Sequence, residues 1–340
     1  MRIAIANDTA IAVEAMRRVI GSVPGYRLAW VAVDGADAVR RCSHDKPDLI
    51  LMDLIMPVMD GAQATLRIMT ATPCAILIVT ATLEGHSGKV FEALGAGALD
   101  VVQTPVLGGS GDIKGASALK VKIASICPLV SGVGPLFDGV VETMPASPAD
   151  ARLPLVAIGA SAGGPAALAT ILSGLPADFP AAIVIVQHLD QEFVPSFASW
   201  LNERSVLPVG VAQQGERPRA SAVLLAQTGD HLALVNSHSL GYTSDPPDCV
   251  YRPSVDVFFQ SVVRHWKGRI AGALLTGMGR DGSHGLKALR NAGALTIAQD
   301  FGSSVVYGMP RAAADLGAAV KILPLEMIAR ELIGFSYARS

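Results

Sequence analysis

A serine stands in a turn of small residues between a predicted strand and a predicted helix. The segment reads LVAIGASAGGP over residues 155–165, and it contains the pattern G-x-S-x-G around Ser161. In a nucleophile elbow of this kind, small neighbours let the backbone turn sharply and lift the serine hydroxyl above the carboxyl end of a parallel sheet. Amides at the start of the following helix would also favour an oxyanion there. The pattern therefore predicts a nucleophilic serine, although a structural turn needs the same small residues.

A nucleophilic serine needs a base, and the base needs an acid that orients it. His188 ends the apolar segment IVIVQH in the unit after Ser161, so neighbouring parallel strands would bring both side chains to one sheet edge. His284 and a purely structural histidine remain the alternatives. Asp281 lies in LLTGMGRDG, after another apolar strand and where a helix begins, a place that also suits a helix N-cap. This chain order differs from the Ser, Asp, His order of α/β-hydrolases, which argues against that fold.

The N-terminal part of the chain holds a second set of reactive groups. Asp8 follows the first predicted strand, Asp53 the third and Thr80 the fourth. In a doubly wound sheet the first and third strands are neighbours, so the two carboxylates would converge and repel unless a hard cation such as Mg²⁺ lay between them. With the ion bound, Asp53 could attack phosphorus as a carboxylate nucleophile. Solvated acids at loop ends remain the alternative for either aspartate alone.

Two series of alternating strands and helices must position these groups, which predicts α/β architecture throughout. The first series forms a doubly wound parallel sheet of five strands, and the second a doubly wound, mainly parallel sheet. The predicted strands of the first series are residues 3–6, 28–33, 49–52, 76–79 and 99–102. Those of the second series are residues 155–158, 182–186, 222–226, 232–235, 270–275 and 295–298.

The stretch between the two series is rich in glycine and proline, which is typical of a linker. A helical pattern at residues 116–127 closes the first series. We therefore expect a first domain over residues 1–128, a linker over residues 129–152 and a second domain over residues 153–340.

Composition limits the classes of function. Of the 340 residues 51% are hydrophobic but only 5% aromatic, which suits parallel strands buried on both faces. A net charge of -2 predicts no broad basic surface, so nucleic acid is not an expected partner. The dispersed cysteines form no C-x-x-C pattern and are interpreted as reduced thiols of a cytoplasmic protein; they are Cys42, Cys74, Cys127 and Cys249.

Neither a signal peptide nor a membrane span is expected. The N-terminus lacks the apolar core of a signal peptide. Residues 153–177 carry no charge and are long enough to cross a bilayer, but their glycines, serines and proline break them into strand, turn and helix. We therefore expect a cytoplasmic protein without direct membrane insertion.

The first domain resembles a two-component receiver domain over its whole length, and its MPVMDG segment is specific to that family. The resemblance implies that Asp53 is the phosphoacceptor and that a histidine kinase is the phosphodonor. It also implies that Asp8, Asp53 and the backbone carbonyl of Ile55 bind Mg²⁺, and that the Thr80 hydroxyl follows the phosphoryl group as a switch.

The first domain also departs from the receiver pattern. Thr104 replaces the lysine that usually precedes the proline after the fifth strand, which removes a cation from the acylphosphate. Val101 stands at the aromatic switch position, and Asn7 where many receivers have another acid.

The second domain is similar to the catalytic domain of chemotaxis-type protein-glutamate methylesterases, the CheB family. The motifs IGASAGGP, VIVQH, RPSVD, LLTGMGRDG and SSVVYGMP occur in the family's order over about residues 153–320. The resemblance implies that Ser161 is the nucleophile, His188 the base and Asp281 the orienting acid. The Met278 amide would help to form the oxyanion hole, and the site would need no metal or other cofactor. Ala162 replaces a threonine that is common after the serine.

The resemblance also implies the partners and the regulation. The substrate would be a methyl-accepting chemoreceptor-type protein, whose glutamate methyl esters the enzyme would hydrolyse. The same residues could also deamidate a glutamine of the receptor. The segments NDTAIAVEAMRRVI and LMDLIMPVMDGAQATLRIM, with Thr104-Pro105, are similar to the Wsp-type branch, which serves a receptor-like pathway controlling a diguanylate cyclase. The unmodified receiver would cover the Ser161 cleft, and phosphorylation would open it.

Three other classes were weighed against this interpretation. One is a non-catalytic response regulator that only docks on receptors or a kinase. A dinucleotide-binding domain is disfavoured because Ser161 replaces the middle glycine of its motif and Gln187-His188, not an acid, ends the next strand. A transcriptional output domain would need basic charge and a helix-turn-helix pattern, and the sequence has neither.

Overall fold

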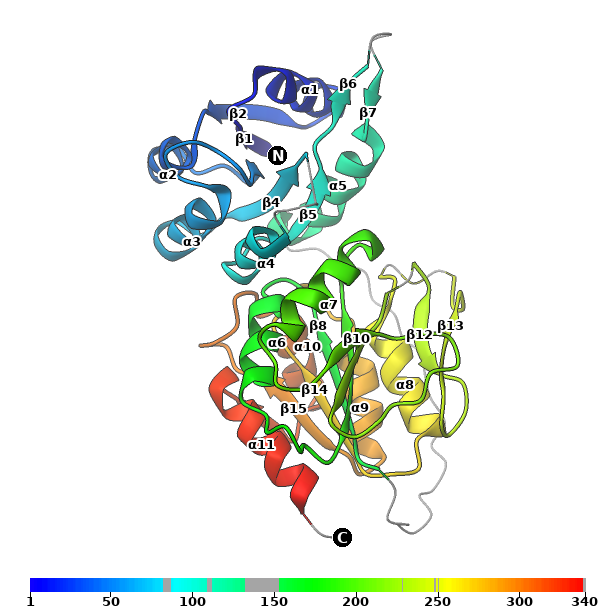
Figure 1. Ribbon diagram of the computed structural model, residues 1–340. Helices are drawn as coiled ribbons and strands as arrows, with labels where there is room; N and C mark the ends of the chain where they lie inside the picture. The colour runs from blue at the N-terminus through cyan, green and yellow to red at the C-terminus, as the bar shows by residue number, and fades with distance from the viewer. Residues whose placement is uncertain are drawn as a thin grey trace. The chain divides into compact units, whose positions relative to one another are not determined.

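The chain forms two compact units, each with its own sheet and its own core (Figure 1). In the computed structural model they comprise Met1–Pro135 and Leu136–Ser340. The structure describes residues 1–81, 87–108, 112–131, 153–227, 229–247, 249 and 251–338. Most of the predicted linker, residues 132–152, lies outside the described residues, and its first three residues belong to the last helix of the first unit.

The sheet of the first unit has five parallel strands with the first and third as neighbours, as predicted, and their full order is β2-β1-β3-β4-β5. They are β1 (Arg2–Ala6), β2 (Arg27–Ala32), β3 (Leu49–Asp53), β4 (Ala75–Thr80) and β5 (Asp100–Gln103). Because Ala6 of β1 pairs with Met52 of β3, the residues after β1 lie beside Asp53 at the carboxyl edge of the sheet. A small unpredicted hairpin follows, formed by β6 (Val106–Leu107) and β7 (Ile113–Lys114).

Helices cover both faces of this sheet (Figure 1). They are α1 (Ala10–Gly21), α2 (Gly35–His44), α3 (Gly61–Ala71), α4 (Ser87–Gly95) and α5 (Ala116–Ser131). Apolar residues of α1 and α5 form one core with alternate residues of the central strands, among them Ile3, Ile5, Leu49 and Leu51. This packing holds the strand ends, and therefore the acidic groups after them, in a rigid frame.

The sheet of the second unit has seven parallel strands in the order β10-β11-β9-β8-β14-β15-β16. They are β8 (Leu155–Ala160), β9 (Ala182–Gln187), β10 (Val209–Val211), β11 (Ala222–Leu225), β14 (Ile270–Leu274), β15 (Leu295–Gln299) and β16 (Lys321–Leu323). The doubly wound, parallel α/β architecture predicted for this domain is confirmed.

One predicted strand of the second series lies outside the main sheet. Residues 232–235 largely coincide with β12 (His231–Leu234), which pairs antiparallel with β13 (Leu240–Thr243) in a separate hairpin. The connection between the two strands is too short for the crossover that a parallel neighbour requires.

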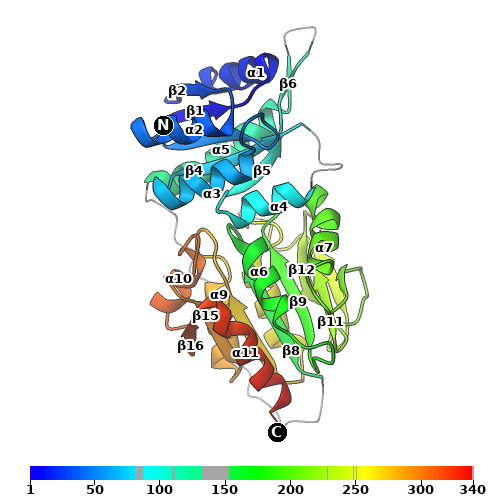
Figure 2. The same cartoon turned by 60° about the vertical axis from the view of Figure 1, so that its left-hand side comes forward.

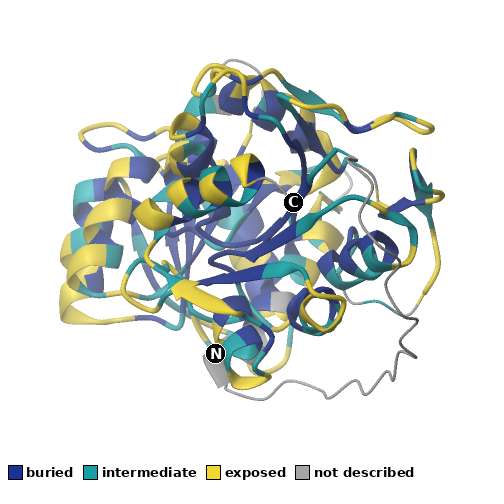
Figure 3. Cartoon of the chain, turned by 90° about the horizontal axis from the view of Figure 1, so that it is seen from below, coloured by how far each residue is buried: buried dark blue, intermediate teal, exposed yellow. Residues whose placement is uncertain are grey.

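The helices of the second unit lie on both faces of its sheet. They are α6 (Gly164–Ser173), α7 (Val194–Asn202), α8 (Val255–His265), α9 (Ser283–Asn291), α10 (Met309–Asp315) and α11 (Leu325–Tyr337), with a short η1 helix (Gln191–Phe193) before α7. Figure 2 shows α6 and α11 along the same face, whereas α8 and α9 pack together on the other (Figure 1). Every residue of β8 and β9 is consequently buried, as the dark central strands of Figure 3 show.

The uncharged stretch over residues 153–177 forms β8, a turn and α6, as the sequence predicted. Within the described parts of the chain, no helix has both the length and the apolar character needed to cross a bilayer.

Candidate active site

Ser161 occupies a sharp turn between β8 and α6. Gly163, next to the helix start, adopts a left-handed φ of 76°, and a Cβ there would lie 2.7 Å from Val305 Cβ. The Ser161 amide donates to the Thr276 carbonyl at 3.1 Å, and the Ser161 carbonyl accepts from Gly164 at 2.8 Å. These two hydrogen bonds fix the backbone of Ser161 on both sides. The residue is only 8% exposed.

His188 lies beside this serine because of strand register. Ala160 of β8 pairs with Gln187 of β9, and the His188 amide donates to the Ala160 carbonyl at 3.0 Å. Ser161 and His188 are the residues that directly follow this pair. On the other side of β8, Leu274 of β14 pairs with Gly159, so the loop after β14 reaches the same edge.

His188 and Asp281 form a close pair at this edge. The His188 Nε2 lies 2.8 Å from Asp281 Oδ2, and the side chains are 11% and 7% exposed. A carboxylate only accepts hydrogen bonds, so Nε2 carries the proton and a neutral ring leaves Nδ1 as an acceptor. That Nδ1 is buried and has no hydrogen-bond partner among the described residues. The described chain shows no hydrogen bond between Ser161 Oγ and His188, a contact that often tightens only when substrate binds.

Asp281 is surrounded by hydrogen-bond donors from the start of α8. Its Oδ1 accepts from Ser254 Oγ at 2.8 Å and from the Asp256 amide at 3.1 Å, and its Oδ2 accepts from the Val255 amide at 2.7 Å. Burial opposes ionisation of Asp281, but hydrogen bonds from His188, Val255 and Ser254 outweigh it and lower the pKa. Asp281 is therefore a carboxylate at neutral pH. It is not the N-cap of α9, the alternative left open by the sequence, because Gly282 holds that position.

Ser254 links this carboxylate to a second, fully buried histidine. The Ser254 amide donates to His231 Nδ1 at 3.1 Å, so the ring proton of His231 lies on Nε2, 3.2 Å from the Pro246 carbonyl that accepts it. Sequence reasoning missed both residues. The RPSVD motif drew attention to Ser254 without indicating a role, and no local signal connected it with His231.

Tyr251 was missed as well, although it touches the predicted base. Its ring stacks on His188 with centroids 4.4 Å apart and an interplanar angle of 1°. A Cβ at Gly279 would lie 2.6 Å from the Tyr251 hydroxyl, so the tyrosine fills the space between the imidazole and the TGMG loop. Burial, followed by the charge of Asp281, raises the pKa of Tyr251, which keeps its hydroxyl neutral.

Asp256 is a second buried carboxyl group beside Asp281. Its Oδ1 accepts from the Gly285 amide at 2.6 Å. Burial and then the charge of Asp281 raise the pKa of Asp256 to about 7, against the opposing effect of amides at the start of α9. The two acids therefore differ in ionisation, with Asp281 charged and Asp256 half-protonated near neutral pH.

The predicted oxyanion residue Met278 follows a glycine that lies against the nucleophile. A Cβ at Gly277 would be 2.8 Å from Ser161 Cβ, and the Gly277 amide and carbonyl are held by Val306 and Gly308. The loop that carries the Met278 amide is therefore fixed next to Ser161. The part of Met278 in an oxyanion hole stays a prediction.

In the first unit, Asp53 ends β3 at the carboxyl edge of the sheet. Its Oδ2 accepts from Asn7 Nδ2 at 2.9 Å, and its Oδ1 accepts from the Leu54 amide at 2.7 Å. Burial raises the pKa of Asp53 to about 6; the amides of Leu54 and Ile55 oppose this, and the charge of Asp8 adds to it. A carboxylate that resists ionisation beside a second acid favours a bound cation, so these residues fit Mg²⁺.

The other predicted groups of this site lie at the same edge. Thr80 ends β4, next to β3, and is buried. In the described parts of the chain no three His, Cys, Asp or Glu side chains gather to hold a metal, so Mg²⁺ would depend on Asp8, Asp53 and the Ile55 carbonyl. At the two divergent positions, the Thr104 amide donates to the Thr80 carbonyl at 3.0 Å, and Val101 is fully buried.

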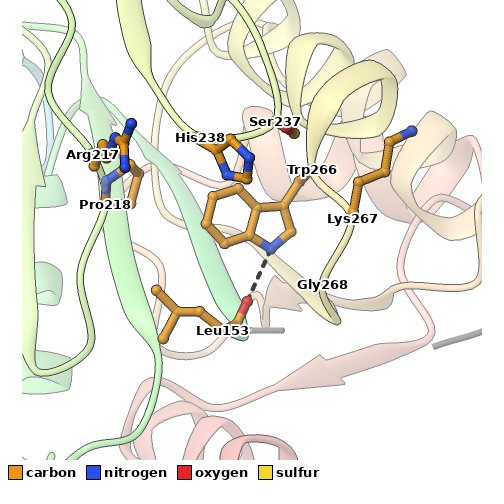
Figure 4. Close-up of a pocket in the computed structure, with 8 residues that line it drawn as sticks. All are labelled: Leu153, Arg217, Pro218, Ser237, His238, Trp266, Lys267 and Gly268. Atoms are coloured by element: carbon orange, nitrogen blue, oxygen red, sulfur yellow. Dashed lines mark hydrogen bonds between the residues drawn. The ribbon is translucent and has the colours of Figure 1, made fainter. Parts of the chain in front are cut away.

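A surface pocket of the second unit lies at the opposite edge of the sheet from Ser161 (Figure 4). It is lined by Leu153, Arg217, Pro218, Ser237, His238, Trp266, Lys267 and Gly268. Leu153 and Gly268 precede β8 and β14, and the Trp266 indole donates to the Leu153 carbonyl at 3.2 Å. Because parallel sheets bind their ligands beyond the carboxyl ends of the strands, this pocket is not the candidate active site.

Together these features define a class: a receiver-type sheet with a half-buried aspartate at its carboxyl edge, followed by an α/β unit with serine, histidine and aspartate at one sheet edge. Known proteins agree with this class. Residues 3–108 match the response regulator receiver domain family, and residues 156–332 match the CheB methylesterase family. The chain belongs to the CheB methylesterase family and carries a receiver domain at its N-terminal side, as the sequence motifs predicted.

Similar proteins cover nearly the whole chain. It is 55% identical over 334 residues, 98% of each protein, to "Protein-glutamate methylesterase/protein-glutamine glutaminase 2" of Pseudomonas syringae pv. syringae. A protein-glutamate methylesterase/protein-glutamine glutaminase of Pseudomonas putida is 54% identical over 336 residues, 98% of this chain and 99% of that protein. The crystal structure of the Thermotoga maritima CheB methylesterase catalytic domain covers 54% of this chain and 99% of its own, with a TM-score of 0.51 and 34% identity.

Proposed function

We propose that this chain is a phosphorylation-regulated protein-glutamate methylesterase whose catalytic residues are Ser161, His188 and Asp281. The observation that carries the proposal is the 2.8 Å contact between His188 Nε2 and Asp281 Oδ2, on the strand end next to Ser161. It leaves His188 Nδ1 without a hydrogen-bond partner in the described part of the chain. The relatives named protein-glutamate methylesterase/protein-glutamine glutaminase support the substrate class.

The reaction is an acyl transfer in two steps. Ser161 Oγ attacks the carbonyl carbon of a γ-glutamyl methyl ester while His188 takes the hydroxyl proton at Nδ1. Asp281 holds the Nε2–H and stabilises the imidazolium, and the Met278 amide donates to the oxyanion. Methanol leaves with the proton from His188. Water, which gives a proton to His188, then attacks the acyl-enzyme, and the glutamate carboxylate of the receptor and the Ser161 hydroxyl are restored. A receptor glutamine would react in the same way, with ammonia as the leaving group.

Tyr251 gives the base a fixed orientation in this scheme. Its parallel stacking on His188 prevents rotation of the ring away from the acid, and an aromatic face also stabilises the positive charge that the imidazole gains. The imidazole is thereby held by Asp281 at one edge and by Tyr251 on one face.

The receiver supplies the regulation. Asp53 accepts a phosphoryl group from a histidine kinase, with Mg²⁺ held by Asp8, Asp53 and the Ile55 carbonyl. When bound, the ion neutralises carboxylate and phosphoryl oxygens and so permits attack by one anion on another. Thr80 donates its hydroxyl to the phosphoryl group, and phosphorylation raises the esterase rate.

The partners follow from this chemistry. The substrate is a methyl-accepting chemoreceptor-type protein, in the cytoplasm, and the motifs of the first unit favour a Wsp-type pathway. No nucleic acid takes part, and the chain acts without inserting into the membrane.

The proposal is tested by methanol release from methylated receptor membranes. Ser161→Ala should abolish release while circular dichroism shows an unchanged fold, because the substitution removes only the attacking oxygen. Release by the alanine variant would remove Ser161 as nucleophile, and absence of release from the native chain with its cognate receptor would favour a protein that only docks.

A further inference from the structure

Two cysteines from different elements face each other in the first unit. Cys42 lies in α2 and Cys74 directly before β4, 32 positions later, yet their sulfur atoms are 3.8 Å apart. Cys42 is 1% exposed, whereas Cys74 is partly exposed. The sequence did not indicate the pair, because no short C-x-x-C spacing connects them.

Regular structure holds both sides of the pair. Cys42 occupies the last turns of α2, which Asp34 caps at the other end. The Cys42 thiol also lies 3.9 Å from the carbonyl of Thr72, the residue that ends α3, so the short loop to β4 crosses over α2. A disulfide has a sulfur–sulfur bond near 2.05 Å, so from 3.8 Å the atoms must approach by about 1.8 Å.

The two thiols are also chemically unequal. The hydrogen bond between the two sulfur atoms lowers the pKa of Cys42 against the effect of burial. The same interaction, with burial, raises the pKa of Cys74. Cys42 is therefore the more acidic thiol of the pair, which favours it as the sulfur that attacks an oxidised Cys74.

We propose that Cys42 and Cys74 are a redox modification site that closes to a reversible disulfide when the protein meets a peroxide. The partly exposed Cys74 is the sulfur that a peroxide can reach. After losing its proton, the Cys74 sulfur attacks one oxygen, the O–O bond breaks, and the leaving hydroxide takes up the proton, so that a sulfenic acid and water result. The buried Cys42 sulfur then attacks Cys74, the S–O bond breaks, and the oxygen leaves as water with the thiol proton. Two thiols and one hydrogen peroxide thus give one disulfide and two waters.

The disulfide would link α2 covalently to the residue before β4. Cys74 precedes the amino end of β4, whereas Asp53 ends β3 at the carboxyl edge, so the disulfide lies away from the phosphoacceptor. Its first effect is therefore on stability. A closed loop of this length restricts the unfolded chain, and we expect the melting temperature of the first unit to rise by ~10 °C.

The test uses the full chain, a small excess of hydrogen peroxide, alkylation of the remaining thiols and peptide mass spectrometry without reductant. We expect a Cys42–Cys74 cross-linked peptide, loss of two of the four thiols and their recovery with dithiothreitol. Cys42→Ser and Cys74→Ser should each abolish the cross-link. Cys249→Ser, which removes a partly exposed thiol of the second unit, should leave it intact.

Three results would overturn the proposal. One is four free thiols at peroxide concentrations that oxidise a small thiol completely. Another is a cross-link that includes Cys127 or Cys249, and the third is a Cys74 that proceeds to sulfinic acid without forming the bond. None of these outcomes bears on Ser161 or Asp53, so the redox site and the proposed function succeed or fail separately.

Discussion

At the scale of single residues, the Ser254 hydroxyl helps to position Asp281, the acid that contacts His188. Ser254→Ala removes one charge-assisted hydrogen bond to Asp281 but leaves the amides of Val255 and Asp256 in place. It also removes the N-cap bond that the Ser254 hydroxyl accepts from the Val257 amide at 3.4 Å, which should cost some stability of α8. We expect kcat to fall about tenfold with KM unchanged, because the lost interaction orients the base and does not bind substrate. Ser254→Thr, which keeps the hydroxyl, should restore most of the rate.

Ser283 provides the matched control for this variant. It is also fully buried near Asp281, but its Oγ has no hydrogen-bond partner among the described residues. Ser283→Ala should therefore leave kcat close to that of the native chain. Equal losses in the two variants would show that Ser254 acts only through packing.

Asp256 should make stability depend on pH. Its pKa is raised from 3.8 to about 7 in the folded protein, so the folded state keeps a proton that the unfolded chain has lost. Stability therefore falls as pH rises from 3.8 to about 7, and it stays level above that range. Asp256→Asn should flatten this dependence, because the amide oxygen still accepts from Gly285 without a charge. Thermal melts that change in parallel with pH for both proteins would contradict the assignment.

The sequence predicted the chemical groups better than their supports. Ser161, His188 and Asp281 each follow an apolar strand, a pattern that parallel sheets place at one edge, and the structure brings them to that edge. Tyr251 and His231 could not be predicted, because their contacts depend on how the hairpin and the loop before α8 fold back onto the sheet. The variants described above test the proposed roles of Ser161, His188 and Asp281.

At the scale of elements, the turn from β8 to α6 is the most constrained part of the site. Gly163→Ala would force a left-handed φ of 76° on a residue with a side chain and place its Cβ 2.7 Å from Val305. We expect a loss of ~1–2 kcal/mol in stability and a sharp fall in kcat, because the turn aims the serine. Gly210→Ala is the control, since a Cβ there has no neighbour within 4 Å. A native rate in the Gly163 variant would show that the elbow tolerates a change of backbone.

Long buried strands were predicted from the sequence, and short exposed strands were not. The strand β8 is a run of apolar residues and glycine, and β9 is apolar up to its last residue, whereas β16 carries mostly exposed residues and β10 has only three half-buried ones. Such edge strands are specified by pairing with an existing neighbour, which no local pattern reveals. The same limit explains why β12 was taken for a strand of the main series and why its partner β13 was not predicted.

At the scale of the whole molecule, the chain joins two chemistries that share no residue. The edge with the proposed phosphoacceptor Asp53 belongs to the five-stranded sheet and the edge with Ser161 to the seven-stranded sheet, each with its own core. The proposed regulation therefore requires that a change at one sheet alters the other. Thr104 replaces the usual lysine, and the buried Val101 stands at the aromatic switch position. The size of the increase in esterase rate on phosphorylation is therefore the quantity to measure.

The most direct measurement is the rate of methanol release from methylated receptor membranes, before and after addition of acetyl phosphate with Mg²⁺. The proposal predicts release by the native chain, a higher rate with the phosphodonor, and loss of that increase in Asp53→Asn. A rate that acetyl phosphate does not change, in a chain whose Asp53 is shown to be phosphorylated, would contradict the regulatory claim. Absence of release under both conditions, with the cognate receptor present, would contradict the esterase itself.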